Sequence, residues 1–132
     1  MKSKQLYILI FSVLGIRLFL NAVIPLMDKT EARYAEIARI MYETGNWISP
    51  QIDYDVVFWA KPPLSIWLNA ISFHVFGVNE FAVRFPSFLL ALLIWFLVSK
   101  LYSNLKDKLV IGLVLFTLPQ FVLHAGVVST DM

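Results

Sequence analysis

Three long apolar runs dominate the chain, at about 6–26, 85–101 and 109–128. A helix rises ~1.5 Å per residue, so about 20 residues cross the ~30 Å hydrocarbon core of a bilayer. Each run is therefore predicted to form a transmembrane helix. The third is expected to kink at Pro119, because proline cannot donate a backbone hydrogen bond. The pattern predicts an all-α integral membrane protein.

The polar and aromatic stretch at 27–84 is predicted to be an external loop with two helices of its own. In the first, at about 31–44, apolar residues recur with the spacing of one helix face. These residues are Tyr34, Ile37, Ala38 and Met41. The second, at about 64–76, is apolar but too short to span, which favours an interfacial or re-entrant helix. The intervening 46–60, with the turn-prone Asp53-Tyr54-Asp55, is predicted to be irregular.

Composition supports a membrane protein and excludes other classes. Of the 132 residues, 59% are apolar and 15% charged, against about 45–50% and 25% in soluble domains. A net charge of +2 without a basic cluster argues against nucleic acid, and the absence of cysteine excludes disulfides. The first run continues to Met27 without a small-residue cleavage site, which favours a permanent span over a signal peptide. Arg17 near its middle is costly in lipid, so it is expected to face other helices or snorkel.

The distribution of basic residues predicts the orientation. The segments 1–5 and 100–108 hold five lysines and one acid between them, so both are expected to be cytoplasmic. The loop 27–84 and Asp131 then lie outside. If 64–76 crossed the membrane, 100–108 would become external, which the same rule disfavours.

Polar clusters follow or precede the predicted spans on this external side. Asp28 and Glu31 come after the first span, Lys61 precedes 64–76, and Asp131 follows the third span. A carboxylate here can deprotonate an acceptor hydroxyl, and a cation can hold a phosphate. The spacing of Asp28 and Glu31 also fits the N-cap and N3 positions of a helix capping box, and Lys61 also suits a snorkelling anchor. The spacing alone leaves the catalytic and structural alternatives open.

Five motifs in order resemble one family over nearly the whole chain, from about Met27 onward. They are TEARYAEIAR at 30–39, GNWISP at 45–50, FWAKPPL at 58–64, FGVNEFAVRFPS at 76–87 and TDM at 130–132. They are similar to motifs of bacterial lipid-linked-sugar glycosyltransferases with the GT-C fold. This group contains the lipid A aminoarabinose transferases and relatives of the protein O-mannosyltransferases (glycosyltransferase families 83 and 39).

The resemblance implies a multi-pass enzyme of the inner or plasma membrane. Such an enzyme transfers a sugar from a polyprenyl-phosphate donor to a lipid, glycan or protein acceptor on the external face. Complete members of the family have about a dozen spans, so the chain is expected to be the N-terminal part of such a domain and inactive alone. The alternative is a non-catalytic membrane module that binds lipid or a partner helix.

The resemblance also implies site residues. A first-loop acid is the proposed base, and the acid of the TDM motif, Asp131, is a further active-site carboxylate. Alignment without gaps places the family's first-loop Asp on Thr30 and its Glu on Glu31, so the base is Glu31 or Asp28. The side chains implied in substrate binding are Lys61, Arg33, Tyr34 and Arg84.

One departure from the family concerns metal binding. Ala60 stands where aminoarabinose transferases carry a Glu before the lysine, and some relatives use that position as a metal ligand. This substitution argues against bound zinc and against the lipid A aminoarabinose reaction. No metal-binding residue is predicted, and a divalent cation remains open as a cofactor.

Overall fold

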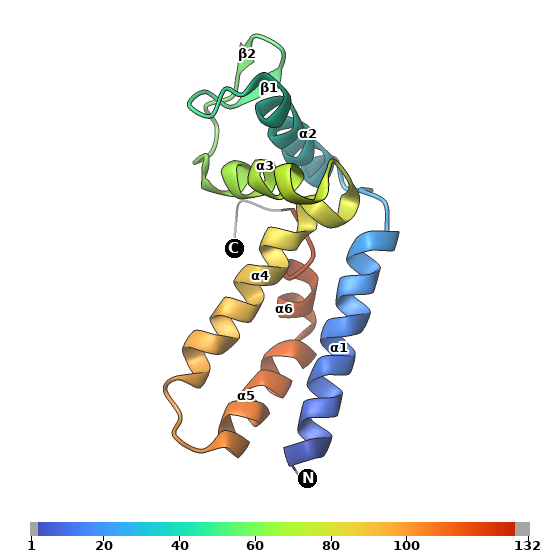
Figure 1. The fold of residues 1–132 in the computed structure, drawn as a ribbon, viewed down its shortest axis with the longest axis vertical. Coiled ribbons are helices and arrows are strands. Elements are labelled where there is room, and N and C mark those ends of the chain that lie inside the picture. The colour runs from blue at the N-terminus through green and yellow to red at the C-terminus, as the bar shows by residue number, and fades with distance from the viewer. Residues whose placement is uncertain (1–2, 129–132) are drawn as a thin grey trace.

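Two long apolar helices form the axis of the molecule in a computed structural model, which describes residues 3–128 (Figure 1). They are α1 (Ser3–Val23) and α4 (Glu80–Ser99), of 21 and 20 residues. Among the described residues, these are the two helices long and apolar enough to cross a membrane. The first and second predicted spans therefore correspond to helices of suitable length and composition.

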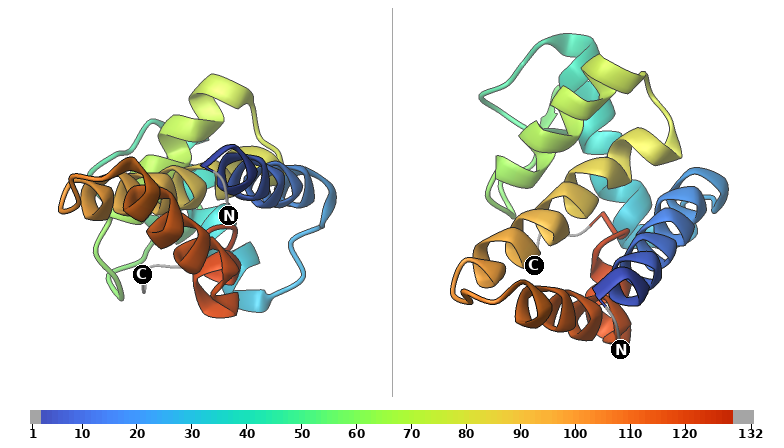
Figure 2. Two further views of the ribbon diagram at one scale, coloured as in Figure 1. Left: turned by 90° about the horizontal axis from the view of Figure 1, so that it is seen from below. Right: turned by 60° about the horizontal axis from the view of Figure 1, so that its bottom comes forward.

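The third predicted span differs from the structure. It consists of α5 (Leu105–Thr117) and α6 (Pro119–His124), separated at Leu118, which has an extended backbone (φ −69, ψ 118). Proline removes a backbone donor and disfavours helical geometry in the residue before it, so the helix breaks here rather than bending. Neither piece alone is long enough to cross a bilayer. α5 lies alongside both α1 and α4 (Figure 2).

A cap of shorter elements covers the end of the helices opposite the N-terminus (Figure 1). It contains α2 (Lys29–Thr44), α3 (Leu64–Phe76) and a hairpin of β1 (Gln51–Asp53) and β2 (Val56–Val57). The two helices predicted in the loop are thus confirmed. The prediction that 46–60 is irregular was wrong in part, because β1 and β2 form a two-stranded hairpin there. Its turn lies at the predicted position, where Asp55 has a positive φ of 64.

Local sequence explains where α2 begins and ends. The Asp28 side chain accepts a hydrogen bond from the Thr30 N–H, as expected of an N-cap. Gly45 adopts the left-handed conformation (φ 68), and its N–H donates to the Met41 carbonyl. The apolar face of α2 packs on α3 and the start of α4. The buried residues of this core are Tyr34, Ala35, Ile37, Ala38, Met41, Ile66, Ala70, Phe73, Ala82, Val83 and Val128.

α4 begins five residues before the predicted start of the second span, at 80 instead of 85, because Asn79 caps it through the Ala82 N–H. Pro86 lies inside this helix and cannot donate to the Ala82 carbonyl four residues earlier. The Ser72 hydroxyl of α3 donates to that carbonyl instead. α3 thereby supplies the missing donor and fixes its own position against α4.

Candidate functional site

A buried ion pair joins the cap to the long helices. Glu31 in the first turn of α2 is 5% exposed, and Arg84 in α4 is 4% exposed. Arg84 Nε donates to Glu31 Oε1 at 2.8 Å, and its Nη2 donates to Oε2 at 2.9 Å. Such a two-pronged geometry is the strong form of an arginine–carboxylate contact. The pair connects residues 53 positions apart in the sequence.

The rest of the Arg84 guanidinium caps α1. Its Nη1 donates to the carbonyls of Asn21 (3.3 Å) and Ile24, and its Nη2 donates to that of Pro25 (3.2 Å). Carbonyls at a helix C-terminus lack partners within the helix, and a cation there is favourable. A guanidinium has five N–H groups and no acceptor. Together with Glu31, these three carbonyls at and just after the end of α1 provide an acceptor for each of the five.

Glu31 also holds the segment after α6. Its Oε1 accepts a hydrogen bond from the Val128 N–H at 3.2 Å, and the Ser87 hydroxyl donates to the Val127 carbonyl at 2.9 Å. Val128 lies three residues before Asp131, which belongs to the part of the chain outside the described residues, as does the rest of the TDM motif. Glu31 thus contacts Arg84 and this segment, and Asp28 alone supplies the observed cap of α2.

Arg17 forms a second, less complete junction. Its Nη2 donates to the Leu123 carbonyl at the end of α6 at 2.8 Å, which confirms that it faces another helix. Its Nε and the Nδ2 of buried Asn21 have no hydrogen-bond partner within residues 3–128. A Cβ at Gly126 would overlap Arg17 Nη2 and Asn21 Oδ1, so the absent side chain permits this close approach.

The remaining predicted site residues lie on the cap. Asp28 and Arg33 are exposed, and Lys61 is half-buried before α3. Tyr34 is buried, with its ring edge-on to Phe58 at 6.2 Å between centroids. This contact brings the stretch leading to Lys61 beside α2. The Trp67 Nε1 group donates to the Trp47 carbonyl at 2.7 Å and fastens the loop to α3.

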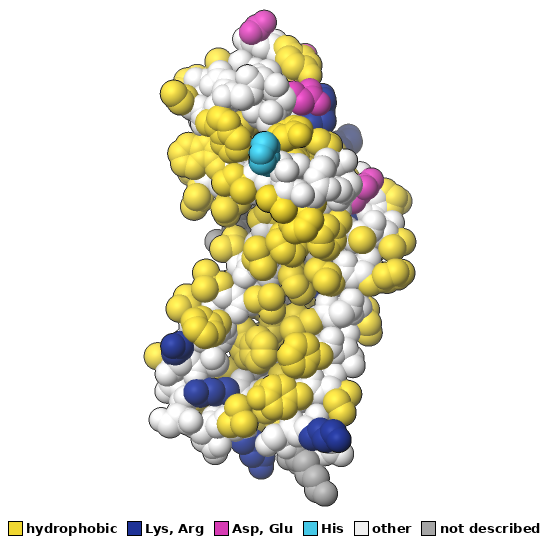
Figure 3. Space-filling view, in the orientation of Figure 1, with side chains coloured by type: hydrophobic (Ala, Val, Ile, Leu, Met, Phe, Trp, Pro, Cys, Tyr) yellow, Lys and Arg dark blue, Asp and Glu magenta, His cyan; other side chains and the backbone are white. Residues whose placement is uncertain are grey.

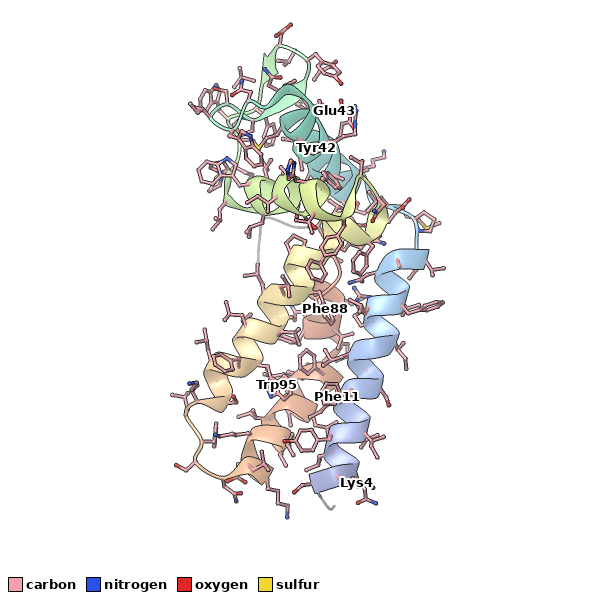
Figure 4. All side chains as sticks on the ribbon, viewed as in Figure 1. Lys4, Phe11, Tyr42, Glu43, Phe88 and Trp95 are labelled. Atoms are coloured by element: carbon pink, nitrogen blue, oxygen red, sulfur yellow. The ribbon has the colours of Figure 1, made fainter. Side chains whose placement is uncertain are left out.

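A second arginine network lies on the exposed side of α2, where Figure 4 shows Glu43 near the hairpin. Arg39 pairs with Glu36 and Glu43, and the Tyr54 hydroxyl donates to Glu43 at 2.7 Å. The hydrogen bond from Arg39 lowers the pKa of Glu36. Hydrogen bonds from Tyr54 and then Arg39 lower the pKa of Glu43. The same Tyr54–Glu43 hydrogen bond raises the pKa of Tyr54.

The surface between the two ends is largely hydrophobic (Figure 3). It includes an apolar groove of about 590 Å³ between α1 and α4, where Phe11, Phe88 and Trp95 are found (Figure 4). A second groove of about 470 Å³ lies between α3 and α4 and includes Ile71, Phe85 and Leu89. Among the described residues, no group of three or more His, Asp or Glu is placed to hold a metal ion.

Sequence reasoning named Glu31 and Arg84 separately but missed their contact. Both lie within the matched motifs, at 30–39 and 76–87, and both follow or precede strongly apolar stretches. That placement signals burial, and a buried charge needs a partner. No spacing rule links residues so far apart, so the partner could not be identified from the sequence.

Comparison with known proteins places these features in one family. The family model described as dolichyl-phosphate-mannose-protein mannosyltransferase matches residues 4–130. Among curated proteins, the undecaprenyl phosphate-alpha-4-amino-4-deoxy-L-arabinose arabinosyl transferase 2 of Proteus mirabilis is 38% identical over 117 residues, which is 86% of this chain. The corresponding transferase of Pectobacterium carotovorum is 38% identical over 120 residues, or 88% of this chain. The chain spans 21% of the length of each of these two relatives.

Solved structures support the fold. The crystal structure of ArnT from Cupriavidus metallidurans in the apo state superposes with a TM-score of 0.77 at 24% identity. The same protein bound to undecaprenyl phosphate gives a TM-score of 0.76 at 23% identity. Each comparison covers 92% of this chain and 23% of the other. The helices and cap described above therefore share the fold of the corresponding part of that membrane protein.

Proposed function

Because the chain belongs to the dolichyl-phosphate-mannose-protein mannosyltransferase family, we propose that it forms part of a membrane glycosyltransferase. The enzyme would move a sugar from a polyprenyl-phosphate carrier to a lipid, glycan or protein acceptor. The observation that carries this proposal is the convergence of the first loop and the segment before Asp131 on Glu31. The first loop and the backbone at Val128, nearly a hundred residues apart in the sequence, thereby lie together at one end of the helices.

The proposed orientation places this end outside the cytoplasm. The lysine-bearing N-terminus and α4–α5 connection lie together at the opposite end (Figure 1), where Figure 3 shows several basic side chains. Segments rich in lysine favour the cytoplasmic side. The cap would then face the periplasm or the cell exterior. The apolar groove between α3 and α4 offers a surface on which the isoprenoid chain of a donor can lie.

Asp28 is the better candidate for the base of the two first-loop acids. Its side chain is exposed, and within residues 3–128 only its Oδ1 accepts a hydrogen bond, from the Thr30 N–H. The Glu31 carboxylate is buried and accepts from Arg84 and Val128. A general base must reach the proton that it removes, and an exposed carboxylate oxygen meets that condition. Glu31 and Arg84 would then act indirectly.

The reaction assigns a role to each remaining residue. The acceptor oxygen forms a bond to the anomeric carbon while the bond from that carbon to the carrier phosphate breaks. The acceptor proton passes to Asp28, and the electron pair of the broken bond stays on the released polyprenyl phosphate. Lys61 would stabilise that phosphate, with Arg33 and Tyr34 lining the site and Asp131 as a further acid. The arabinosyl relatives suggest an amino-pentose, whereas Ala60 departs from their metal-binding pattern.

The test measures transfer of labelled sugar from an undecaprenyl-phosphate donor by the product of the whole reading frame. Asp28→Asn keeps an acceptor for the Thr30 N–H, so helix capping should survive while turnover falls by about 100-fold. Lys61→Met, which keeps the apolar stem, should lose a comparable factor. Asp55→Asn on the exposed hairpin is the matched control and should retain full turnover. Near-normal turnover in both site variants would refute the assignment.

The chain covers only 21% of the length of the two relatives named above, and this small share leads to a second expectation. The 132-residue chain by itself is expected to insert into membranes but to transfer no sugar. Measurable turnover by that purified chain would show that these 132 residues contain a complete site.

A further inference from the structure

The geometry points to Glu31 and Arg84 as a positioning pair that fixes the loop carrying Asp28 against the end of α1, α4 and the backbone at Val128. Neither side chain is available to a substrate, because both are about 95% buried and all five Arg84 N–H groups already have acceptors. Their role must therefore be exerted through what they hold. This inference rests on the proposed function only in its assignment of Asp28 as the base.

The first element held is the loop that carries Asp28. Arg84 Nη2 contacts the Pro25 carbonyl at 3.2 Å and the Glu31 carboxylate at 2.9 Å. One planar group thus fixes the chain three residues before Asp28 and three residues after it. A loop bracketed this closely has little freedom to move its central carboxylate. The Asp28 side chain then needs only its own cap contact with Thr30 to be oriented.

The second element held is the segment that leads to Asp131. Glu31 Oε1 receives both the Arg84 Nε–H and the Val128 N–H, at 2.8 and 3.2 Å. The same carboxylate oxygen therefore joins α4 to the backbone at Val128, the last residue that the structure describes. Ser87, one turn beyond Arg84 on α4, adds a contact to the Val127 carbonyl. A shift of either partner would therefore move the Asp28 loop and the Val128 backbone together.

Charge alone does not explain this arrangement. Replacing a buried ion pair by apolar side chains of similar volume is often neutral or favourable for stability. If Arg84 contributed only to stability, it could therefore be replaced together with Glu31 at little cost. The carbonyl contacts to Asn21, Ile24 and Pro25 depend instead on the planar fork of donors, which no apolar side chain reproduces. The double replacement Glu31→Leu with Arg84→Met therefore removes these contacts without leaving a buried charge unpaired.

The first test is geometric and independent of catalysis. The chain has no cysteine, so single spin labels can be placed at Met27 (83% exposed), Leu123 (59%) and Leu101 (81%). In the double variant, the nanosecond mobility of the Met27 and Leu123 labels in lipid nanodiscs should rise at least twofold. Leu101, at the far end of α4, should not change. Unchanged mobility at Met27 would overturn the inference.

The second test reads catalysis in the product of the whole reading frame. With the fold retained, the double variant should lose at least tenfold in kcat while KM for the donor changes less than twofold, because binding groups remain. Glu36→Leu with Arg39→Met, the same exchange on the exposed face of α2, should leave both constants unchanged. A folded double variant with normal kcat would refute positioning. Absence of transfer in the unaltered protein would instead refute the proposed function, and the mobility test would still decide this inference.

Discussion

The molecule contains two arginine–carboxylate networks that differ in burial and in what they connect. Arg84 and Glu31 have side chains that are 5% and 7% exposed, and their contacts reach α1, α2, α4 and the segment after α6. Arg39 pairs with Glu36 and Glu43 three and four residues away on one helix, with side chains 31–47% exposed. The chemistry of the two is alike, but only the first joins segments that are distant in the sequence.

This difference predicts unequal consequences for stability. Exposed ion pairs contribute about 0–1 kcal/mol, because water screens the charges and the side chains lose entropy. Removing one partner of a buried pair costs about 3–5 kcal/mol, because the other charge is left without compensation. The short distances within the Arg39 network are therefore no guide to its importance. Burial and the number of joined segments are better guides.

The largest effect is expected from single substitutions in the buried pair. Arg84→Met alone should destabilise the fold by about 3–5 kcal/mol, since it strands the Glu31 carboxylate and leaves the α1 carbonyls without donors. Thermal unfolding of the detergent-solubilised protein measures this loss. Adding Glu31→Leu should recover only the share due to the stranded carboxylate, because the carbonyls of Asn21, Ile24 and Pro25 still lack their donors. Equal losses from Arg84→Met and from Arg39→Met would break the contrast between the two networks.

Features of the fold that depend on neighbouring residues were predictable from the sequence, whereas contacts between distant residues were not. The 13-residue helix α3 was predicted at its observed bounds, because Pro63 and Gly77 flank an apolar run. The cap and end of α2 follow equally from Asp28 and Gly45. The break at Leu118 was predicted only as a kink, since a proline fixes where a helix is disturbed but tertiary packing decides how far. The Glu31–Arg84 contact needed the fold itself.

A smaller effect is expected at Arg17, which resembles Arg84 in facing a helix end but has fewer partners. Gly126→Ala places a methyl group against Arg17 and Asn21, both ends of adjustable side chains. Strain of this kind costs about 1 kcal/mol or more, and chemical denaturation in micelles should detect it. The control is Gly15→Ala in α1, which meets no atom within 4 Å and should be neutral or slightly stabilising. If Gly126→Ala left the free energy of unfolding unchanged, the contacts around Arg17 would contribute as little to stability as the exposed Arg39 network.

The smallest effect concerns pH and the exposed network. The Glu43 pKa is lowered in the folded state by Tyr54 and Arg39, so its contribution is present above the ordinary glutamate pKa of about 4.3 and disappears as the pH falls through the lowered value. The Tyr54 pKa is raised by Glu43, so that contribution is complete below about 10 and disappears as the pH rises through the raised value. The network should therefore be intact from about pH 5 to 9.

The Tyr54–Glu43 hydrogen bond shifts the pKa of both partners, so this small effect can be measured at Tyr54. Ultraviolet difference titration, with Tyr54→Phe subtracted from the unaltered protein, isolates the ionisation of Tyr54. Glu43→Gln should lower the Tyr54 pKa, because the neutral amide accepts a weaker hydrogen bond from the hydroxyl than the carboxylate does and Arg39 still favours the phenolate. Arg39→Met should raise the Tyr54 pKa further, since Arg39 lowers it in the intact network. The unfolding midpoint at neutral pH should hardly change in either variant. A large loss of stability would mean that the hairpin relies on this bond, and exposure would then be a poor guide to the worth of an ion pair in this fold.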